Sequence, residues 1–130
     1  MSATSELCFH FLRVVDGVPV LRDGVTPAPP VGEWLEYTGP LVCCRSGLHA
    51  SRRAIDALSY YNWENGVVCL VEVDGIGGEE NDKIVCSRRR IVAMVEADEL
   101  LRLFARAARD AAWDATNDLL ESMLLGEMGP

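Results

Sequence analysis

Short runs of aromatic and β-branched residues, separated by turn residues, occupy the first part of the chain. Residues 7–21, LCFHFLRVVDGVPVL, hold two β-branched and aromatic runs on either side of Asp16-Gly17. This dipeptide is typical of a type I′ turn, so the segment predicts a β-hairpin. Residues 66–75, GVVCLVEVDG, are apolar on both faces until Glu72, which predicts a central strand.

Two short strands and a short helix are predicted between these segments. Residues 33–51 predict two strands separated at residues 38–40 and followed by a turn at residues 46–47. Apolar residues then recur at helical spacing at Ala54, Ile55, Leu58 and Tyr61. They predict a helix with Ser51 as its N-cap and an end near Asn62.

The last third of the chain changes from strand to helix periodicity. Residues 74–83, glycine-rich and acidic, predict a solvated loop, because the ligand spacing of a calcium loop is missing. Residues 83–97 predict one or two strands around a basic run. Beyond residue 98, apolar residues recur every three or four positions, which predicts a long amphipathic helix. They are Leu100, Phe104, Ala107 or Ala108, Ala111, Ala115, Leu119 and Met123.

The predicted order of elements is therefore ββ–ββ–α–ββ–α. This order predicts an α+β fold, a mainly antiparallel sheet with one short helix and one long C-terminal helix. A chain of 130 residues is expected to form a single domain over 1–130, with the sheet and short helix over about 7–95 and the long helix over about 98–125.

Composition and charge narrow the classes of function. The net charge is −8, which argues against general nucleic-acid binding, since neutralising phosphates needs clustered Lys and Arg. No apolar run approaches the ~20 residues of a membrane span. The first residues, MSATSELCFHF, lack the pattern of a secretory signal. We therefore expect a soluble cytoplasmic protein that does not bind a membrane.

The cysteines predict no metal site. The chain has five, at Cys8, Cys43, Cys44, Cys69 and Cys86. An odd number without a regular spacing is typical of reduced thiols. Cys43 and Cys44 would point to opposite faces of a strand, so they are poorly placed to share one metal ion. No metal and no cofactor are expected.

The start of the predicted short helix is the first candidate site. Arg52 and Arg53 stand in its first turn, just after His49 and Ser51. The free N–H groups, the Ser51 hydroxyl and the guanidiniums could converge on an anion. Alternatively, Asp56 and nearby carboxylates neutralise the two arginines, whose stems cover apolar surface.

The remaining polar residues leave further alternatives open. His10 and His49 are either site residues or structural histidines, and Tyr60 is either a stacking surface or packing. A lone Ser51 with a histidine and no identified acid is no triad, so no catalytic residue is assigned. The candidate set for binding an anion or ligand is His10, His49, Ser51, Arg52, Arg53 and Tyr60.

The basic run Arg88–Arg90 is predicted to divide between the two faces of a strand. Arg88 and Arg90 share one face and Arg89 takes the other. The acidic residues Glu79, Glu80 and Asp82 are expected to pair with this run.

Residues 43 to about 106 resemble a family of small uncharacterised proteins from phages and actinobacteria. The resemblance rests on CxxGLHAS, a short helix with A-x-x-AL-x-Y, VxLVEVDG, DKIV and RRRIV. In that family a Gly-x-His stretch precedes a helix and a Val-Glu-Val-x-Gly strand. It implies a phage-derived protein and no particular activity.

A second, fainter resemblance is to the ADP-ribosyltransferase core. It rests on a first strand with His10, then GLHAS, a short helix ending at Tyr60-Tyr61, and VVCLVEV. It implies that His10 and Ser51 hold a nicotinamide ribose and that Glu72 orients the nucleophile. His49 stands where that family has a stacking aromatic residue.

Two functions are predicted. The first is binding of a host or partner protein without catalysis, through the long helix or through residues 49 to 63. A helix too long for so small a sheet also predicts a homodimer through the C-terminal helix. The alternative is a nucleotide- or phosphate-binding enzyme with a degenerate ADP-ribosyltransferase-like fold.

Overall fold

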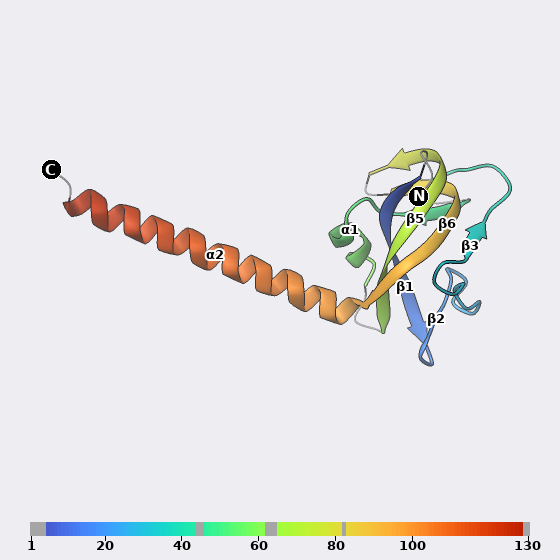
Figure 1. Ribbon diagram of the computed structural model, residues 1–130, viewed down its shortest axis with the longest axis horizontal. Coiled ribbons are helices and arrows are strands. Elements are labelled where there is room, and N and C mark those ends of the chain that lie inside the picture. Colours follow the sequence, from blue (N-terminus) through green and yellow to red (C-terminus); the bar gives the residue numbers. More distant parts are fainter. Residues whose placement is uncertain (1–4, 44–45, 62–64, 82, 129–130) are drawn as a thin grey trace. The chain divides into compact units, whose positions relative to one another are not determined.

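The computed structural model describes residues 5–43, 46–61, 65–81 and 83–128 and divides the chain into two compact units, residues 1–98 and 99–130 (Figure 1). The first unit contains β1 (Glu6–Val15), β2 (Val18–Pro19), β3 (Trp34–Glu36), β4 (Leu48–Ala50), α1 (Ala54–Leu58), β5 (Gly66–Glu80) and β6 (Lys83–Glu96). Helix α2 (Ala97–Met128) accounts for the described part of the second. The predicted α+β class and order of elements are confirmed.

All strands belong to one antiparallel sheet. Its order is β2-β1-β5-β6-β3, and β4 also pairs with β6. The first hairpin turns at Asp16 and Gly17, whose φ angles of 51° and 79° are those of the predicted type I′ turn.

The long β5–β6 hairpin corrects the prediction of a solvated loop over residues 74–83. Strand β5 continues to Glu80, and Glu79 pairs with Ile84. The chain turns only near Asn81, which has a positive φ. The apolar start of β6 supplies backbone partners for the acidic segment, and these hydrogen bonds outweigh its low strand propensity.

The segment before α1 also differs from the prediction. Ser51 is not the N-cap: its N–H donates to Phe9 O, and Phe9 N–H donates to Ser51 O, both at 2.7 Å. This pairing requires extended backbone, so the cap position falls to Arg53, which makes no side-chain capping bond. Helix α1 ends at Leu58, and the predicted end at Asn62 lies outside the described residues.

These two hydrogen bonds close the sheet on itself. Strand β1 pairs with β5, β5 with β6 and β6 with β4, and Ser51, directly after β4, returns to β1. The sheet therefore curls around an apolar interior. The interior residues are Cys8, Leu12, Ala50, Cys69, Val71, Val73, Ile84, Cys86 and Ile91.

A glycine allows the chain to enter β4. A second short strand was predicted before the turn at residues 46–47, but among the described residues that segment forms only a bridge between Val42 and Ser46. The strand forms after Gly47 instead. Gly47 has a φ of +106°, and a Cβ there would lie 2.6 Å from Val85 Cγ2. Only glycine combines this conformation with so close an approach.

Helix α2 extends the predicted long helix by a few residues at its C-terminal end. Every residue from 105 to 126 is exposed, including its large apolar side chains. No helix in the described part of the chain is both long and apolar enough to cross a membrane.

Candidate anion-binding site

A cavity of about 500 Å³ lies at the interior of the curled sheet. Both histidines of the chain line it, His10 from β1 and His49 from β4. Several cationic side chains line the same space, among them Arg22 from the loop after β2, and Lys83 and Arg89 from β6. Its lining is therefore basic although the chain is acidic overall.

Arg89 is the unusual member of this set. It is 8% exposed, and its Nη1 donates a hydrogen bond to the backbone oxygen of His49. No carboxylate of the described residues forms an ion pair with it; Glu33 lines a small adjoining cavity beside it without pairing. Burial lowers the pKa of the Arg89 guanidinium. A buried charge without a counter-charge costs several kcal/mol, on the order of the net stability of a small domain.

The cations also act on the two histidines. Burial lowers the pKa of His10 well below its ordinary value, and the charges of Arg89, His49 and Lys83 lower it further. Burial likewise lowers the pKa of His49, assisted by Lys83, Arg22 and Arg89. Both rings are therefore neutral at pH 7, and a neutral imidazole carries one N–H donor and one acceptor nitrogen.

The one carboxylate among the described lining residues belongs to Asp23, and it is already engaged. Its Oδ1 accepts hydrogen bonds from the N–H groups of Val25 (2.9 Å) and Thr26 (2.8 Å), and its Oδ2 accepts one from the Thr26 hydroxyl. These bonds lower the pKa of Asp23. Asp23 therefore stays ionised and shapes its own loop, and both of its carboxylate oxygens already accept hydrogen bonds.

Apolar side chains form much of the remaining wall, with Phe11, Leu12, Val20, Leu35 and Leu48 among them. Tyr60 stands at the wall with Lys83 Nζ 4.5 Å from its ring centroid. Ligand pockets typically combine an apolar wall with a few polar groups. The cavity therefore suits a molecule with an anionic group and an apolar part.

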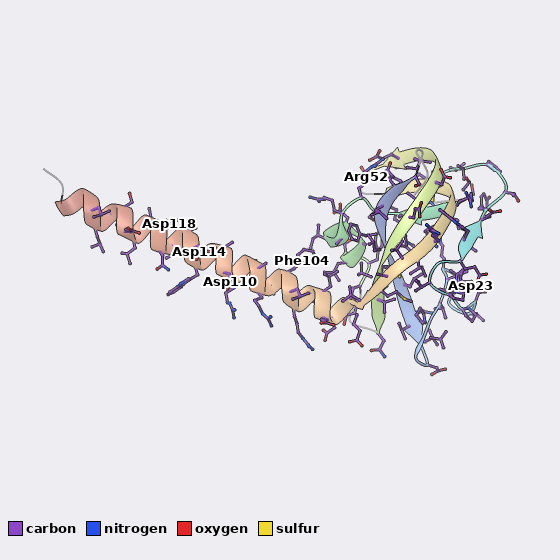
Figure 2. All side chains as sticks on the ribbon, in the orientation of Figure 1. Asp23, Arg52, Phe104, Asp110, Asp114 and Asp118 are labelled. Carbon is purple, nitrogen blue, oxygen red and sulfur yellow. The ribbon has the colours of Figure 1, made fainter. Side chains whose placement is uncertain are left out.

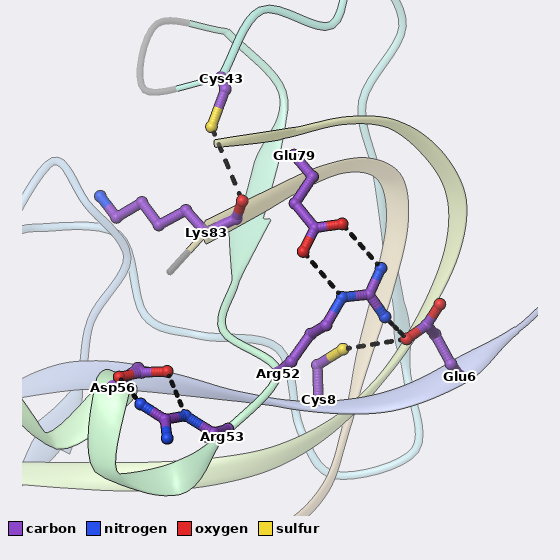
Figure 3. A network of polar contacts seen from close by, with 8 residues as sticks. All are labelled: Glu6, Cys8, Cys43, Arg52, Arg53, Asp56, Glu79 and Lys83. Atoms are coloured by element: carbon purple, nitrogen blue, oxygen red, sulfur yellow. Dashed lines mark hydrogen bonds and ion pairs between the residues drawn. The ribbon is translucent and has the colours of Figure 1, made fainter. Parts of the chain in front are cut away.

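Four of the six candidate residues line this cavity: His10, His49, Ser51 and Tyr60. Arg52 and Arg53 do not. Figure 3 shows the Arg52 guanidinium between Glu6 and Glu79, and Arg53 pairs with Asp56 at 2.9 Å. Of the carboxylates expected to neutralise the two arginines, Asp56 pairs with Arg53, whereas the partners of Arg52 are Glu6 and Glu79.

Sequence reasoning missed Arg22, Lys83 and Arg89. Alternation on the strand did predict that Arg89 faces away from Arg88 and Arg90, and the cross-strand register confirms it. The available signal was that Arg89 shares its strand face with Ile91, an interior residue. Arg89 is a cation among apolar residues. From periodicity alone, an apolar residue would be predicted at its position.

Arg88 and Arg90 have other partners than those predicted. Arg88 pairs with Glu36 (3.1 Å) and Asp74 (3.4 Å), and Arg90 Nε donates to Glu72 Oε2 at 2.7 Å. The acidic residues near the hairpin turn, which were predicted as partners, lie toward the far end of the strands; Asp82 lies outside the described residues. Cross-strand neighbours provide the counter-charges because they stand directly opposite on one face.

Glu72 does not reach the cavity. In the β1–β5 register Glu72 stands opposite Leu7, whereas His10 stands opposite Cys69, so Glu72 and His10 lie on opposite faces. Hydrogen bonds from the Ser5 hydroxyl and from Arg90 lower the pKa of Glu72. Glu72 therefore does not share a site with His10, although the resemblance to ADP-ribosyltransferases implied that both serve the same site.

The three buried thiols are unsuited to nucleophilic chemistry. Burial raises the pKa of Cys8 to about 11, of Cys69 to about 12 and of Cys86 to about 11, so all three are protonated at pH 7. Within the described segments, no group of three His, Cys, Asp or Glu side chains could hold a metal ion.

Comparisons with known proteins give a family and no activity. The family model DUF7666, described as a domain of unknown function, matches residues 26–103. No curated protein and no solved structure matches the chain. The matched segment runs from before β3 into α2 and contains His49, Lys83 and Arg89, but not His10. The chain belongs to the DUF7666 family.

Proposed function

We propose that the chain binds a small phosphorylated molecule in the cavity lined by His10, His49 and Arg89. One observation carries the proposal: Arg89 is a buried cation without a carboxylate partner among the described residues, in a chain of net charge −8. A bound anion would supply the missing counter-charge and recover the cost of burying the guanidinium.

Phosphate fits the available donors. A guanidinium offers parallel N–H groups that match two phosphate oxygens, and an ammonium group adds a point charge. Arg89, Lys83 and a neutral histidine N–H together provide such a set. The apolar wall would contact the rest of the ligand, and about 500 Å³ lies within the usual range of ligand pockets.

The proposal is for binding without catalysis. Glu72 faces away from the cavity, and the buried thiols of Cys8, Cys69 and Cys86 are protonated. Neutral histidines could accept a proton, but among the described residues the side chains that line the cavity include no activated nucleophile. The lack of such a nucleophile disfavours catalysis. Of the alternative function, a nucleotide- or phosphate-binding enzyme, we therefore keep the binding and not the catalysis.

Thermal unfolding with added ligands tests the proposal. The probes are inorganic phosphate, AMP, ADP-ribose and NAD, with adenosine as the uncharged control and benzoate as a carboxylate. A ligand at 100 times its dissociation constant adds about 2.7 kcal/mol to the free energy of unfolding. We expect at least one phosphorylated probe to stabilise the protein and adenosine to have no effect.

A pair of adjacent substitutions provides the control. Arg89→Met removes the cavity cation, whereas Arg88→Met makes the same change on the other face of β6. The stabilisation by the phosphorylated probe should disappear in the first variant and persist in the second. No shift with any phosphorylated probe, a larger shift with benzoate, or an undiminished shift in Arg89→Met would each overturn the proposal.

A second candidate function is the binding of a protein partner through α2. The exposed apolar side chains of this helix favour it, with Leu119, Met123 and Trp113 between 56% and 66% exposed. If the chain is phage-derived, as its first resemblance implies, a host protein is one candidate partner. Residues 49 to 63 carry less weight for this role, because His49 and Ser51 are buried.

A further inference from the structure

A single pair of residues closes the seam between β1 and β4. Phe9 and Ser51 exchange two backbone hydrogen bonds there, both 2.7 Å long. In a regular antiparallel ladder the next pair with the same hydrogen bonds would be Phe11 and His49. Among the described residues that pair is not formed, and the backbone oxygen of His49 accepts a hydrogen bond from Arg89 Nη1 instead. The seam is therefore open after one pair, and a guanidinium stands where a strand partner would.

The backbone of Phe11 faces this opening. Alternate residues of a strand direct their N–H and C=O groups to the same side. Phe9 directs both groups to Ser51, so Phe11 directs its own groups to that side as well. Further along, the backbone oxygen of Arg13 accepts a hydrogen bond from Val20 N–H at 2.9 Å, which bounds the opening. No described group forms a hydrogen bond with the N–H or the C=O of Phe11 on this edge.

The cavity enters the opening between the two strands. Consecutive residues line it, from 10 to 13 on β1 and from 47 to 51 across β4. Because side chains alternate between the two faces of a strand, an unbroken run of lining residues indicates that the strand edge itself borders the space. Asp23 lines the cavity and Arg52, directly after Ser51, does not; Figure 2 shows these two residues well apart. The cavity therefore lies on the Phe11 side of the closed pair.

We propose that the phosphorylated ligand occupies this opening and carries a hydroxyl group next to its phosphate, as a sugar phosphate or polyol phosphate does. The inference rests on the proposed function and names the class of its ligand. The phosphate accepts hydrogen bonds from the Arg89 guanidinium and from the N–H of Phe11. The neighbouring hydroxyl donates to the backbone oxygen of Phe11.

The hydroxyl is needed because the open edge presents an acceptor as well as a donor. A phosphate ester at pH 7 is mainly a dianion, which accepts hydrogen bonds and donates none. Alone, it would leave the Phe11 oxygen without a donor, and a buried acceptor without a partner costs free energy. The N–H and the C=O of one residue lie close together on a strand edge, so their two partners must be neighbours in the ligand.

Two phosphate esters of equal charge and equal chain length test the class of ligand. Glycerol 3-phosphate carries hydroxyl groups and propyl phosphate carries none. In a titration followed by the amide NMR signals, we expect glycerol 3-phosphate to bind about 10-fold more tightly, the value of about one net hydrogen bond. Equal affinity, tighter binding of propyl phosphate, or binding of neither at millimolar concentration would overturn the inference.

Amide-to-ester replacement tests the Phe11 N–H. Phenyllactic acid in place of Phe11 removes this donor and keeps the side chain, and the affinity for glycerol 3-phosphate should fall at least about 10-fold. The matched control places the α-hydroxy analogue of leucine at Leu7, whose N–H has the same direction on β1 but lies beyond the Phe9–Ser51 pair, outside the cavity. No loss at Phe11, or an equal loss at Leu7, would exclude the Phe11 N–H as a ligand donor.

Amide hydrogen exchange tests the same edge in the unaltered protein. The N–H groups of His10 and Leu12 point to β5, so the ladder protects them, whereas that of Phe11 should exchange at least about 100-fold faster. Glycerol 3-phosphate should slow the exchange of Phe11. Protection of Phe11 equal to that of its neighbours without ligand would show a closed seam. Binding that requires Arg89 but leaves the exchange of Phe11 unchanged would overturn this inference alone, whereas no binding of any phosphorylated probe would overturn the proposed function with it.

Discussion

Arg88 and Arg89 are neighbours on β6, yet their surroundings are opposite. Arg88 is half-buried with its side chain 39% exposed, pairs with Glu36 and Asp74, and stacks on Trp34 with 4.2 Å between guanidinium carbon and ring centroid. Arg89 is 8% exposed and has no carboxylate partner among the described residues. On one face of the strand, Arg88 forms ion pairs that stabilise the fold. On the other face, the burial of Arg89 costs stability that no ion pair within the described residues offsets.

The outer face of this part of the sheet is internally neutralised. Trp34 contacts both Arg88 and Arg90, at 4.2 and 4.9 Å, and cross-strand carboxylates surround the two guanidiniums. Because the two guanidiniums of this face are already paired with carboxylates, they are poorly available to bind a ligand. The cavity face instead places guanidiniums, including those of Arg22 and Arg89, an ammonium and two neutral imidazoles around an open volume. This difference is why we propose the cavity face, and not the outer face, as the ligand-binding surface.

The largest expected difference between the faces is in pH dependence. Folding lowers the pKa of His10, chiefly by burial and then through Arg89, His49 and Lys83. Below pH 6.5 the unfolded chain therefore binds more protons than the folded one, so this contribution is present above that pH and is lost as pH falls. The free energy of unfolding should drop by up to about 2 kcal/mol per histidine between pH 7 and pH 5.

His10→Gln should remove part of that drop, leaving the share contributed by His49. Urea unfolding at closely spaced pH values measures it. Because the outer face carries no histidine, Arg88→Met should retain the full slope of the unaltered protein. A slope identical in His10→Gln and the unaltered chain would show that the ring does not sit in a cationic, buried environment.

A smaller effect on the free energy of unfolding is expected when the stacking contacts on the outer face are removed. Trp34→Ala removes the ring between Arg88 and Arg90, and each such contact at a partly exposed site contributes roughly 0.5–1 kcal/mol. We expect a loss of about 1–2 kcal/mol in the free energy of unfolding, measured by urea titration. Ligand affinity should not change, and a parallel loss of affinity would mean that the two faces are coupled.

Much of the fold follows from local patterns. The type I′ hairpin at Asp16-Gly17, the central strand and the long helix were all predicted, since each rests on local turn chemistry or periodicity. Ser51 was misassigned as a cap because its role is to pair with Phe9, more than 40 residues away, and no local pattern encodes that contact. The acidic end of β5 was missed for the same reason, because its partner is β6.

The candidate site was predictable only in part. His49 and His10 were both named as candidate residues, and both line the cavity. Arg52 and Arg53 were named as well, but carboxylates neutralise them at the surface. Arg89 escaped attention because it lies within a basic run whose other members are exposed. Which of three consecutive arginines faces the interior depends on strand register, which is set by distant partners.

The most direct test of the central claim is the stability of Arg89→Met against Arg88→Met, measured by urea unfolding in a buffer free of phosphate and other multivalent anions. Replacing a buried charge with an apolar side chain is often neutral or stabilises by about 1–4 kcal/mol, so we expect Arg89→Met to be at least as stable as the unaltered protein. Arg88→Met should lose up to about 1 kcal/mol, the usual value of partly exposed ion pairs. A clear loss of stability in Arg89→Met, equal to or larger than that in Arg88→Met, would mean that Arg89 supports the fold, and it would contradict its assignment as a ligand-binding charge.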